Sequence, residues 1–458
     1  MDSRRALSSL LVLASFLAAT HTPLLAEQPE KAYSLKSARQ PGELARVEIG
    51  LQVGGDLKLV TDGKPNVLPM SVVANFDYDE RLLAADASGR PSQSLRFYKT
   101  ARAVIKVDKG GERPTLDQAH CLIRVDKPQK NAAVLFCPAG PLKREELDLI
   151  DMPGNTLLID DLLPAKSVML GESWKLTDEA LASLLGIEAV NWTDVQSVLG
   201  EVVEGVADIA AAGSVSGAIG GVATEIELKA KYKFDLKLKQ ITFLAILIKE
   251  KRAIGHIGPG LDTVAKLVIK ISPISESEHL ASEAVAGLSN NLTPELSQLA
   301  YSAPSGGFQF QYDRRWYLTS DDPKMAVLRL MDRGELVAQC NMSALPFDPK
   351  KTITLAEFQK DVQKSLGKNF GQFASASETT NEAGSQVFRV VAHGSVSQLP
   401  ISWIYYLIAN EKGQRVTLSF TYEQTLEERF AKADRLLVGQ VRLTDSPVPT
   451  AARAIKPK

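Results

Sequence analysis

The sequence predicts a mainly β N-terminal domain, built on a curved antiparallel sheet, and an α+β C-terminal domain, in which an antiparallel sheet carries two helices. Two observations lead to this prediction. From Ile226 to Leu236 apolar and charged residues alternate, which is the pattern of a half-buried antiparallel strand. Between residues 304 and 443, strand-like segments are interrupted by two amphipathic segments of helical period. The length of 458 residues leaves room for two or three domains.

The amino end of the chain has the order of features found in a secretory signal peptide. Two arginines precede an apolar stretch from Ala6 to Ala19, and a polar break follows. The stretch is shorter than the roughly 18 to 20 residues that a membrane-spanning helix needs. We expect residues 1–26 to be removed by cleavage after Ala26, with Ala19 as the alternative. The mature protein is then exported, to the periplasm or the extracellular space, without a membrane span.

Residues 45–272 form the predicted β-rich domain. The alternation slips phase over residues 236–240, which predicts a hairpin whose second strand, Ile241–Ile248, is apolar on both faces and lies deeper in the sheet. One short helix, from Asp178 to Leu185, interrupts the strands and ends at Gly186. The other predicted strands are Val47–Val53, Val72–Tyr78, Leu95–Val107, Val202–Ile209 and Val264–Ile271.

The remaining residues divide into a linker, a second domain and a tail. Residues 273–303 are rich in Ser, Glu and Asn and predict a linker with room for one loose helix. The α+β domain follows over residues 304–443. Residues 444–458 contain three prolines and predict a disordered tail.

The two helices of the C-terminal domain are predicted from capping boxes. Thr354 with Glu357 opens the first helix, and Gly367 ends it. Thr425 with Glu428 opens the second helix. The predicted strands of this domain are Phe308–Tyr312, Ala326–Met331, Leu336–Ala344, Gln386–Ala392, Ile401–Ala409 and Arg415–Tyr422.

Several features of this domain occur together in one order. They are the run Phe308–Trp316, a helix after three strands, the aromatic segment Trp403–Tyr406, the segment Gly413–Phe420 and a final helix over Phe430–Leu437. Together they resemble the PsbP-like family of α/β/α sandwiches, over residues 301–443. The resemblance implies an exported protein that binds other proteins and is not an enzyme, and it assigns no binding residue. The N-terminal domain is similar to exported bacterial domains of unknown function.

Two of the three cysteines stand where a disulfide is expected. Cys121 and Cys137 flank two short strand segments around the turn Asp126–Asn131. Pairing Ile123 with Leu135 across this hairpin places the two cysteines opposite each other, within disulfide reach. We therefore predict a structural Cys121–Cys137 bridge, which in an oxidising compartment would stabilise the domain by about 3 kcal/mol. A reactive thiol at Cys121, beside the preceding histidine, is the alternative.

A search of the sequence for catalytic and metal-binding motifs finds none. The run Gly213–Gly221 lacks the Lys-Ser/Thr of a phosphate-binding loop and the serine of a nucleophile elbow, so it is interpreted as turn or strand-crossing structure. The carboxylates at Glu145–Asp148 and Asp160–Asp161 are interpreted as solvated surface charge. We predict no catalytic residue, no cofactor-binding residue and no metal ligand. Four histidines follow residue 26 without a second ligand at metal spacing, namely His120, His256, His279 and His393.

Composition and charge narrow the function further. Hydrophobic residues make up 45% of the chain and charged residues 23%, as in ordinary globular proteins. A net charge of −1 provides no field that would collect nucleic acid. The leading expectation is a non-enzymatic envelope protein that binds a protein partner or assists assembly. Because a curved antiparallel sheet can enclose an apolar molecule, a carrier of a lipid or other apolar ligand is the alternative. A hydrolase is the third hypothesis.

Overall fold

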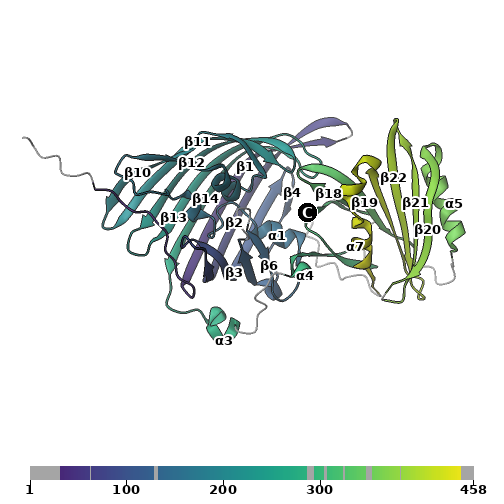
Figure 1. The fold of residues 1–458 in the computed structure, drawn as a ribbon, viewed down its shortest axis with the longest axis horizontal. Coiled ribbons are helices and arrows are strands. Elements are labelled where there is room, and N and C mark those ends of the chain that lie inside the picture. Colours follow the sequence, from purple (N-terminus) through teal and green to yellow (C-terminus); the bar gives the residue numbers. More distant parts are fainter. Residues whose placement is uncertain are drawn as a thin grey trace, which may run out of the picture.

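Three β-sheets organise the molecule. The structure, a computed structural model, describes residues 31–61, 63–127, 133–285, 293–303, 307–322, 325–346, 353–381 and 383–444. Over these residues the sheets have thirteen, seven and four strands, and we call them the large, small and joining sheets. Figure 1 shows the large sheet at one end of the molecule and the small sheet at the other. The predicted fold class is confirmed, because antiparallel strands dominate both ends and helices are few.

The large sheet is a continuous antiparallel ladder, curved as Figure 1 shows. In spatial order it contains β6 (Val134–Phe136), β5 (Leu122–Asp126), β3 (Pro91–Val107), β2 (Lys64–Ala85), β1 (Leu44–Thr61), β14 (Gly260–Pro273), β13 (Gln240–Arg252), β12 (Val222–Asp235), β11 (Val206–Ile219), β10 (Gln196–Val203) and β8 (Ser173–Lys175), with β4 (Gly110–Glu112) beside β3 and β9 (Ala189–Thr193) beside β11. The β1–β14 pair joins two groups of sequential hairpins into one sheet.

Buried and exposed side chains alternate along β12, and a hairpin turn connects this strand to β13. Along β12 every second side chain, from Thr224 to Phe234, is buried and those between are exposed, as the sequence predicts. A turn over residues 236–239 leads into β13, which confirms the predicted hairpin. The predicted strand Val202–Ile209 is wrong. Glu204 and Gly205 adopt left-handed conformations, with φ of 51° and 83°, and form a two-residue turn that divides this apolar run between β10 and β11.

A segment between β6 and β9, residues 141–187, packs against the buried face of the large sheet, and we call it the insert. It contains α1 (Arg144–Ile150), the 3₁₀ turn η2 (Ile159–Leu162) and α2 (Asp178–Leu185). Leu157, Leu181 and Leu184 of the insert belong to the same core as the sheet residues Ile269 and Phe234. The protein therefore fills most of the curved sheet with its own chain.

A buried ion pair fixes the insert to the sheet. Glu80 on β2 and Arg96 on β3 are almost fully buried, and the Arg96 Nε donates to a Glu80 carboxylate oxygen at 2.9 Å. Thr156 of the insert donates to the same oxygen at 2.7 Å, and Arg96 Nη2 donates to Thr156 Oγ1 at 2.8 Å and Asn155 Oδ1 at 2.5 Å. Burial raises the pKa of Glu80, but the charges of Arg96 and Arg39 and the Thr156 hydroxyl together hold it below its usual value.

The small sheet is an antiparallel ladder with helices on both faces. In order it contains β17 (Trp316–Asp322), β18 (Met325–Asp332), β19 (Glu335–Ala344), β23 (Arg415–Glu423), β22 (Leu399–Ala409), β21 (Gln386–Val396) and β20 (Phe370–Thr380). Helix α5 (Leu355–Leu366) covers one face through Phe358, Val362 and Leu366. On the other face, Phe430 of α6 (Glu427–Phe430) stacks on Tyr422 with ring centroids 4.4 Å apart, and α7 (Ala433–Gly439) follows.

One of the two predicted capping boxes is present. The Thr354 hydroxyl accepts from the Glu357 amide at 3.3 Å, and the Glu357 carboxylate accepts from the Thr354 amide at 2.8 Å. The box predicted at Thr425 is wrong, because residues 424–426 form a 3₁₀ turn and α6 begins without a side-chain cap. The chain also leaves helical geometry at residues 431–432, so the predicted second helix is two short ones.

The joining sheet connects the two ends of the molecule. It contains β24 (Arg442–Leu443), β16 (Phe308–Tyr312), β15 (Leu299–Ser302) and β7 (Leu142–Lys143). Strand β7 belongs to the insert and pairs in parallel with β15, with Leu142 opposite Leu299. Between β14 and β15 the chain forms the turn η3 (Glu278–Leu280) and the short helices α3 (Ser282–Val285) and α4 (Pro294–Ser297).

Two hairpin turns also meet between the large and small sheets. Gly221 lies in the β11–β12 turn and Gly334 in the β18–β19 turn, with φ of 73° and 77°. A Cβ added to Gly221 would overlap the Gly334 carbonyl oxygen, so the two turns are in backbone contact. Nearby, the Arg329 guanidinium on β18 donates to the His256 carbonyl in the β13–β14 loop.

We expect Glu80→Ala to lower the free energy of unfolding by about 3 to 5 kcal/mol, because it leaves the buried Arg96 guanidinium without its carboxylate. Glu227→Ala is the control, because Glu227 pairs with Lys249 at 3.0 Å on the exposed face of the sheet. Removing that exposed pair changes stability by less than about 1 kcal/mol. Urea denaturation measures both values, and similar losses in the two variants would contradict the anchoring role of Glu80.

We expect Gly221→Ala to destabilise the protein more than Gly205→Ala. Both glycines are the second residue of a two-residue turn with positive φ, so both variants carry the left-handed penalty of about 1 kcal/mol. A Cβ on Gly205 meets nothing within 4 Å, whereas on Gly221 it meets the Gly334 backbone. The additional loss of unfolding free energy in Gly221→Ala, about 1 to 3 kcal/mol, measures the steric cost of the contact between the two turns. Equal thermal unfolding midpoints would show that the turns do not press on each other in solution.

Candidate functional site

A cavity of about 1150 Å³ lies where the insert, one end of the large sheet and the first strand of the small sheet meet. Its walls come from α1 and the loop after it, from α2 and the turn that ends it, from β9, β11, β12 and β13, from the β13–β14 loop, and from Tyr317 on β17. The cavity therefore lies between the two ends of the molecule, a common position for ligand sites.

Hydrogen bonds and a glycine at the helix ends determine where α1 and α2 begin and where α2 ends. The Thr177 hydroxyl accepts from the Ala180 amide at 3.1 Å and starts α2, and Gly186, with φ of 68°, ends it as predicted. The chain then turns directly into Ile187, Glu188 and β9. On α1, the Glu146 carboxylate accepts from the Lys143 amide at 2.9 Å, which fixes the start of the helix that carries Arg144 and Asp148.

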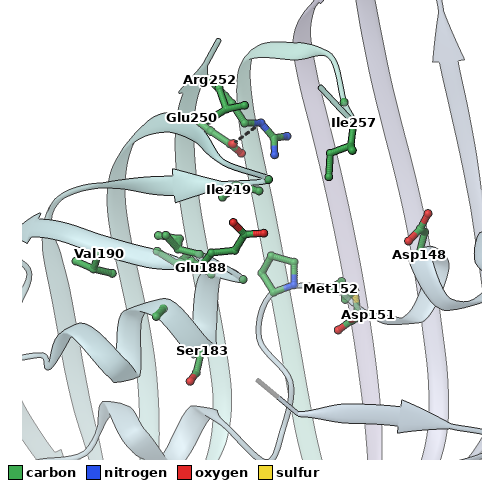
Figure 2. Close-up of a pocket in the computed structure, with 18 of the residues that line it drawn as sticks. Asp148, Asp151, Met152, Ser183, Glu188, Val190, Ile219, Glu250, Arg252 and Ile257 are labelled. Carbon is green, nitrogen blue, oxygen red and sulfur yellow. Dashed lines mark ion pairs between the residues drawn. The ribbon is translucent and has the colours of Figure 1, made fainter. Parts of the chain in front are cut away.

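Apolar side chains form much of the cavity wall. They come from the loop after α1, the end of α2, β9, β11, β12 and the β13–β14 loop, and include Met152, Pro153, Leu158, Ile187, Val190, Ile219, Val222 and Ile257. In Figure 2, Val190 lies at the left and Ile257 at the upper right, with Ile219 between them, and Met152 lies next to Asp151. An apolar molecule entering here would lose contact with water on several sides.

Two arginines of the wall already have carboxylate partners. Arg144 Nε lies 3.0 Å from an oxygen of Asp148, and its guanidinium lies over the Tyr317 ring at 4.6 Å from the centroid. Arg252 Nε lies 3.3 Å from Glu250 Oε1, the pair that Figure 2 marks with a dashed line. Burial raises the pKa of Glu250. Within the described residues, both atoms of this second pair are buried without a hydrogen-bond partner.

Asp151 and Glu188 also line the cavity, and both residues are exposed to solvent. Burial raises the pKa of Asp151, although Arg314 lies near enough to lower it in part. One Glu188 oxygen accepts from the Gly221 amide at 3.2 Å, so Glu188 also touches the contact between the two hairpin turns. Figure 2 shows the Glu188 carboxylate pointing inward, toward the side where Met152 and Asp151 lie.

The chemistry of the wall suits binding. Among the described lining residues there is one serine, Ser183, and no histidine or cysteine. Acidic oxygens and apolar surface dominate instead. The arrangement can hold an amphipathic molecule by burying its apolar part and pairing its polar part.

The predicted disulfide does not form. Cys121 and Cys137 are free thiols, and the pairing register is wrong by two residues, because Val125 and not Ile123 lies opposite Leu135. Residues 118–120 fold into a 3₁₀ turn that keeps Cys121 out of β5, and its thiol donates to the Asp117 carbonyl at 3.6 Å. Burial raises the pKa of both thiols, which also disfavours the reactive-thiol alternative.

None of the four predicted histidines is a lining residue of the cavity, although His256 lies between the lining residues Gly255 and Ile257. His120 Nδ1 lies 2.9 Å from the Glu146 carboxylate, and His393 Nδ1 lies 3.0 Å from Ser402 Oγ on the neighbouring strand. His279 stacks on Phe97 with ring centroids 3.7 Å apart. None of these groups lines the cavity. Within the described part of the chain, no group of three or more His, Cys, Asp or Glu side chains is arranged to hold a metal ion.

Two of the carboxylates interpreted as surface charge are buried, which corrects that interpretation. Asp160 is only 4% exposed, accepts from the Ser37 hydroxyl at 2.6 Å, and has its pKa raised to about 6 by burial. Glu146 is also buried and caps α1. The glycine-rich run is strand and hairpin turn, as predicted, with Gly220 and Gly221 at the turn.

Parts of the sequence prediction fall on residues that the structure does not describe. The signal peptide, residues 1–26, and residues 445–458 of the predicted tail lie outside the described residues. Across the residues that are described, helices long and apolar enough to cross a membrane are absent.

The cavity residues were not predicted from the sequence. They come from segments around residues 144–158, 178–190, 219–222 and 250–259, and only the fold brings these together. One local signal is visible in hindsight. In Leu147-Asp-Leu-Ile-Asp-Met-Pro153 acidic residues are set directly among apolar ones, which is unusual for a fully solvated surface.

Comparison with known proteins yields no family. No family model and no curated protein matches the chain. Among solved structures, PsbP from the cyanobacterium Synechocystis sp. PCC 6803 matches 35% of this chain and 99% of its own at 14% identity and a TM-score of 0.27. A lipovitellin structure concerned with lipid–protein interactions matches 52% of this chain at 10% identity and a TM-score of 0.28, but the match spans only 25% of lipovitellin. TM-scores this low identify neither a family nor a function.

Proposed function

We propose that this protein is a non-enzymatic carrier that encloses a lipid-sized amphipathic ligand in the cavity between its large and small sheets. The observation that carries the proposal is the cavity itself, with about 1150 Å³ of space. Pockets for drug-sized molecules usually have about 300 to 1000 Å³, so this cavity has room for a larger molecule. Its wall of apolar side chains with a few charged groups supports a ligand that has both an apolar and a polar part.

The position of the cavity also supports a carrier role. Because the insert already fills most of the sheet, a ligand would occupy one end and not the whole curved face. Tyr317 is contributed by the small sheet and the remaining wall by the other end of the molecule. A change in how the two ends pack would therefore open or close the site.

A protein-binding accessory is the second candidate. Strand β20 is the last strand of the small sheet and is exposed along most of its 11 residues. Such an edge can accept a strand from a partner. The resemblance of residues 301–443 to PsbP-like proteins, which mostly bind other proteins, supports the same role.

We further propose that the protein acts after export, on the basis of the pattern in residues 1–26. The mature amino terminus is expected to follow Ala26, or Ala19 at the alternative site. Amino-terminal sequencing of the protein from its native host measures this directly. A mature protein that still begins at Met1 would contradict both export and the proposed compartment.

We expect the protein, purified without detergent, to release an amphipathic molecule on organic extraction, detected by mass spectrometry. Ala182→Trp fills the cavity from α2 and is expected to lower the amount bound at least tenfold. Ala210→Trp is the control, because Ala210 is exposed on the opposite face of the large sheet. Equal loading of both variants would show that the ligand lies elsewhere. An empty protein that crosslinks to a partner through β20 would favour the accessory role.

A further inference from the structure

The outward side of the large sheet, which is the side turned away from the insert, carries lysines at the middle of the sheet. Along β12 the exposed positions are occupied in turn by Lys229, Lys231 and Lys233, while the positions between them face the core. On β14, Lys266 and Lys270 are exposed on the same side. The five lysines therefore lie on one face of three neighbouring strands, with β13 between β12 and β14 (Figure 1).

The strand register sets these lysines among apolar side chains. Three rows of directly opposed residues cross the three strands, and we call their nine members the lysine patch: Lys229 with Leu247 and Lys266, Lys231 with Ala245 and Val268, and Lys233 with Phe243 and Lys270. The patch contains no carboxylate, and its four apolar members do not belong to the buried core. It extends about 14 Å along the strands and about 10 Å across them, so its side chains can reach one flat surface although the sheet curves.

Most of the positive charge of the patch is uncompensated. Lys233 pairs with Asp208 on β11 at 3.2 Å. Among the described residues, no ion pair or side-chain hydrogen bond involves the other four lysines, although Glu48 of β1 lies opposite Lys270 in the register. Ammonium groups two positions apart on one face of a strand start about 7 Å apart and repel one another. A layer of anions in front of the sheet would remove this repulsion.

The apolar members of the patch indicate what kind of anion fits. Leu247 is 36% exposed between two lysines, and Val264, one row further along β14, is 45% exposed. A hydrophilic polyanion would gain nothing from these side chains. The interfacial region of a bilayer accepts apolar side chains and the hydrocarbon stems of lysines, while the ammonium groups stay at the level of the lipid phosphates. A second copy of the chain, docked by the same patch, would place lysine against lysine.

We propose that the lysine patch is a docking surface for a bilayer that contains anionic phospholipid. The four lysines without a carboxylate partner would lie at the lipid phosphates, and Leu247 and Phe243 would enter the headgroup region. Attraction of several lysines to an anionic leaflet adds up but is screened by salt, so docking is reversible. This inference goes beyond the carrier function and does not depend on it, because none of the patch residues lines the cavity.

Flotation of the whole protein with lipid vesicles tests the proposal. One set of vesicles contains phosphatidylcholine alone, and in the other set phosphatidylglycerol replaces one third of it. We expect at least tenfold tighter binding to the anionic vesicles at low salt, and a loss of most of this binding at high salt because salt screens the charges. Equal binding to the two compositions, or binding to neither, would overturn the proposal.

Matched variants locate the contact. The double variant Lys231→Gln with Lys266→Gln removes two charges of the patch and is expected to weaken binding to the anionic vesicles at least fivefold. Lys360→Gln with Lys364→Gln is the control, because both lysines are exposed on α5 of the small sheet and the net charge changes equally. The control is expected to bind as the unaltered protein does. Equal weakening in the two double variants would show that binding follows net charge and not the patch.

A further variant and a soluble polyanion distinguish a bilayer from an acidic polymer. Leu247→Ser keeps every charge and is expected to weaken binding to the anionic vesicles at least threefold, while binding to heparin stays unchanged. Heparin binding by a protein that does not bind anionic vesicles would overturn the proposal in favour of an acidic polymer. The comparison of vesicles on the unaltered protein does not depend on whether any variant folds, and its result leaves the carrier function untouched.

Discussion

The ion pair between Glu80 and Arg96 is the interaction on which the rest of the architecture depends. It joins two neighbouring strands of the large sheet and, through Asn155 and Thr156, holds the loop of the insert against them. Burying two charges is costly, and additional hydrogen bonds to the pair offset part of that cost. Asn155 and Thr156 of the insert supply such hydrogen bonds, and Arg39 lies 3.8 Å from the second Glu80 oxygen. The charged pair therefore helps to specify where the insert lies.

The position of the insert determines which part of the large sheet is covered and where a cavity remains. The leucines of η2 and α2 fill the buried face of the sheet beside the pair. Beyond α2, the cavity wall is formed by β9, β11, β12, β13 and the β13–β14 loop. The small sheet contributes only Tyr317 to this wall among the described residues. The parallel pairing of Leu142 with Leu299 connects the insert to the joining sheet, and the touching turns at Gly221 and Gly334 connect the large sheet to the small sheet. Gly220, next to the second of these contacts, lines the cavity.

The sequence predicts those elements whose signal is local. Helix α2 has a threonine cap and a glycine stop within one short segment, and β12 carries its whole pattern in alternate residues. Features that depend on pairing between distant segments are not predicted. The Cys121–Cys137 bridge required a particular hairpin register, but β5 and β6 pair in another register and a 3₁₀ turn keeps Cys121 out of β5. The cavity is a further case, because Asp151 and Glu188 are 37 positions apart in the chain and come together only after the insert folds onto the sheet.

The same ion pair connects the interior of the sheet to the cavity. Asn155 lines the cavity and also accepts a hydrogen bond from Arg96 at 2.5 Å, so one residue belongs to both the anchor and the candidate site. Asp151 lies four positions before it, on the same loop, and therefore its carboxylate is positioned by a segment that cannot move without disturbing a buried charge. Glu188 is held separately, through the Gly221 amide at the contact between the two sheets. One carboxylate is thus fixed by the core and the other by the junction between the sheets.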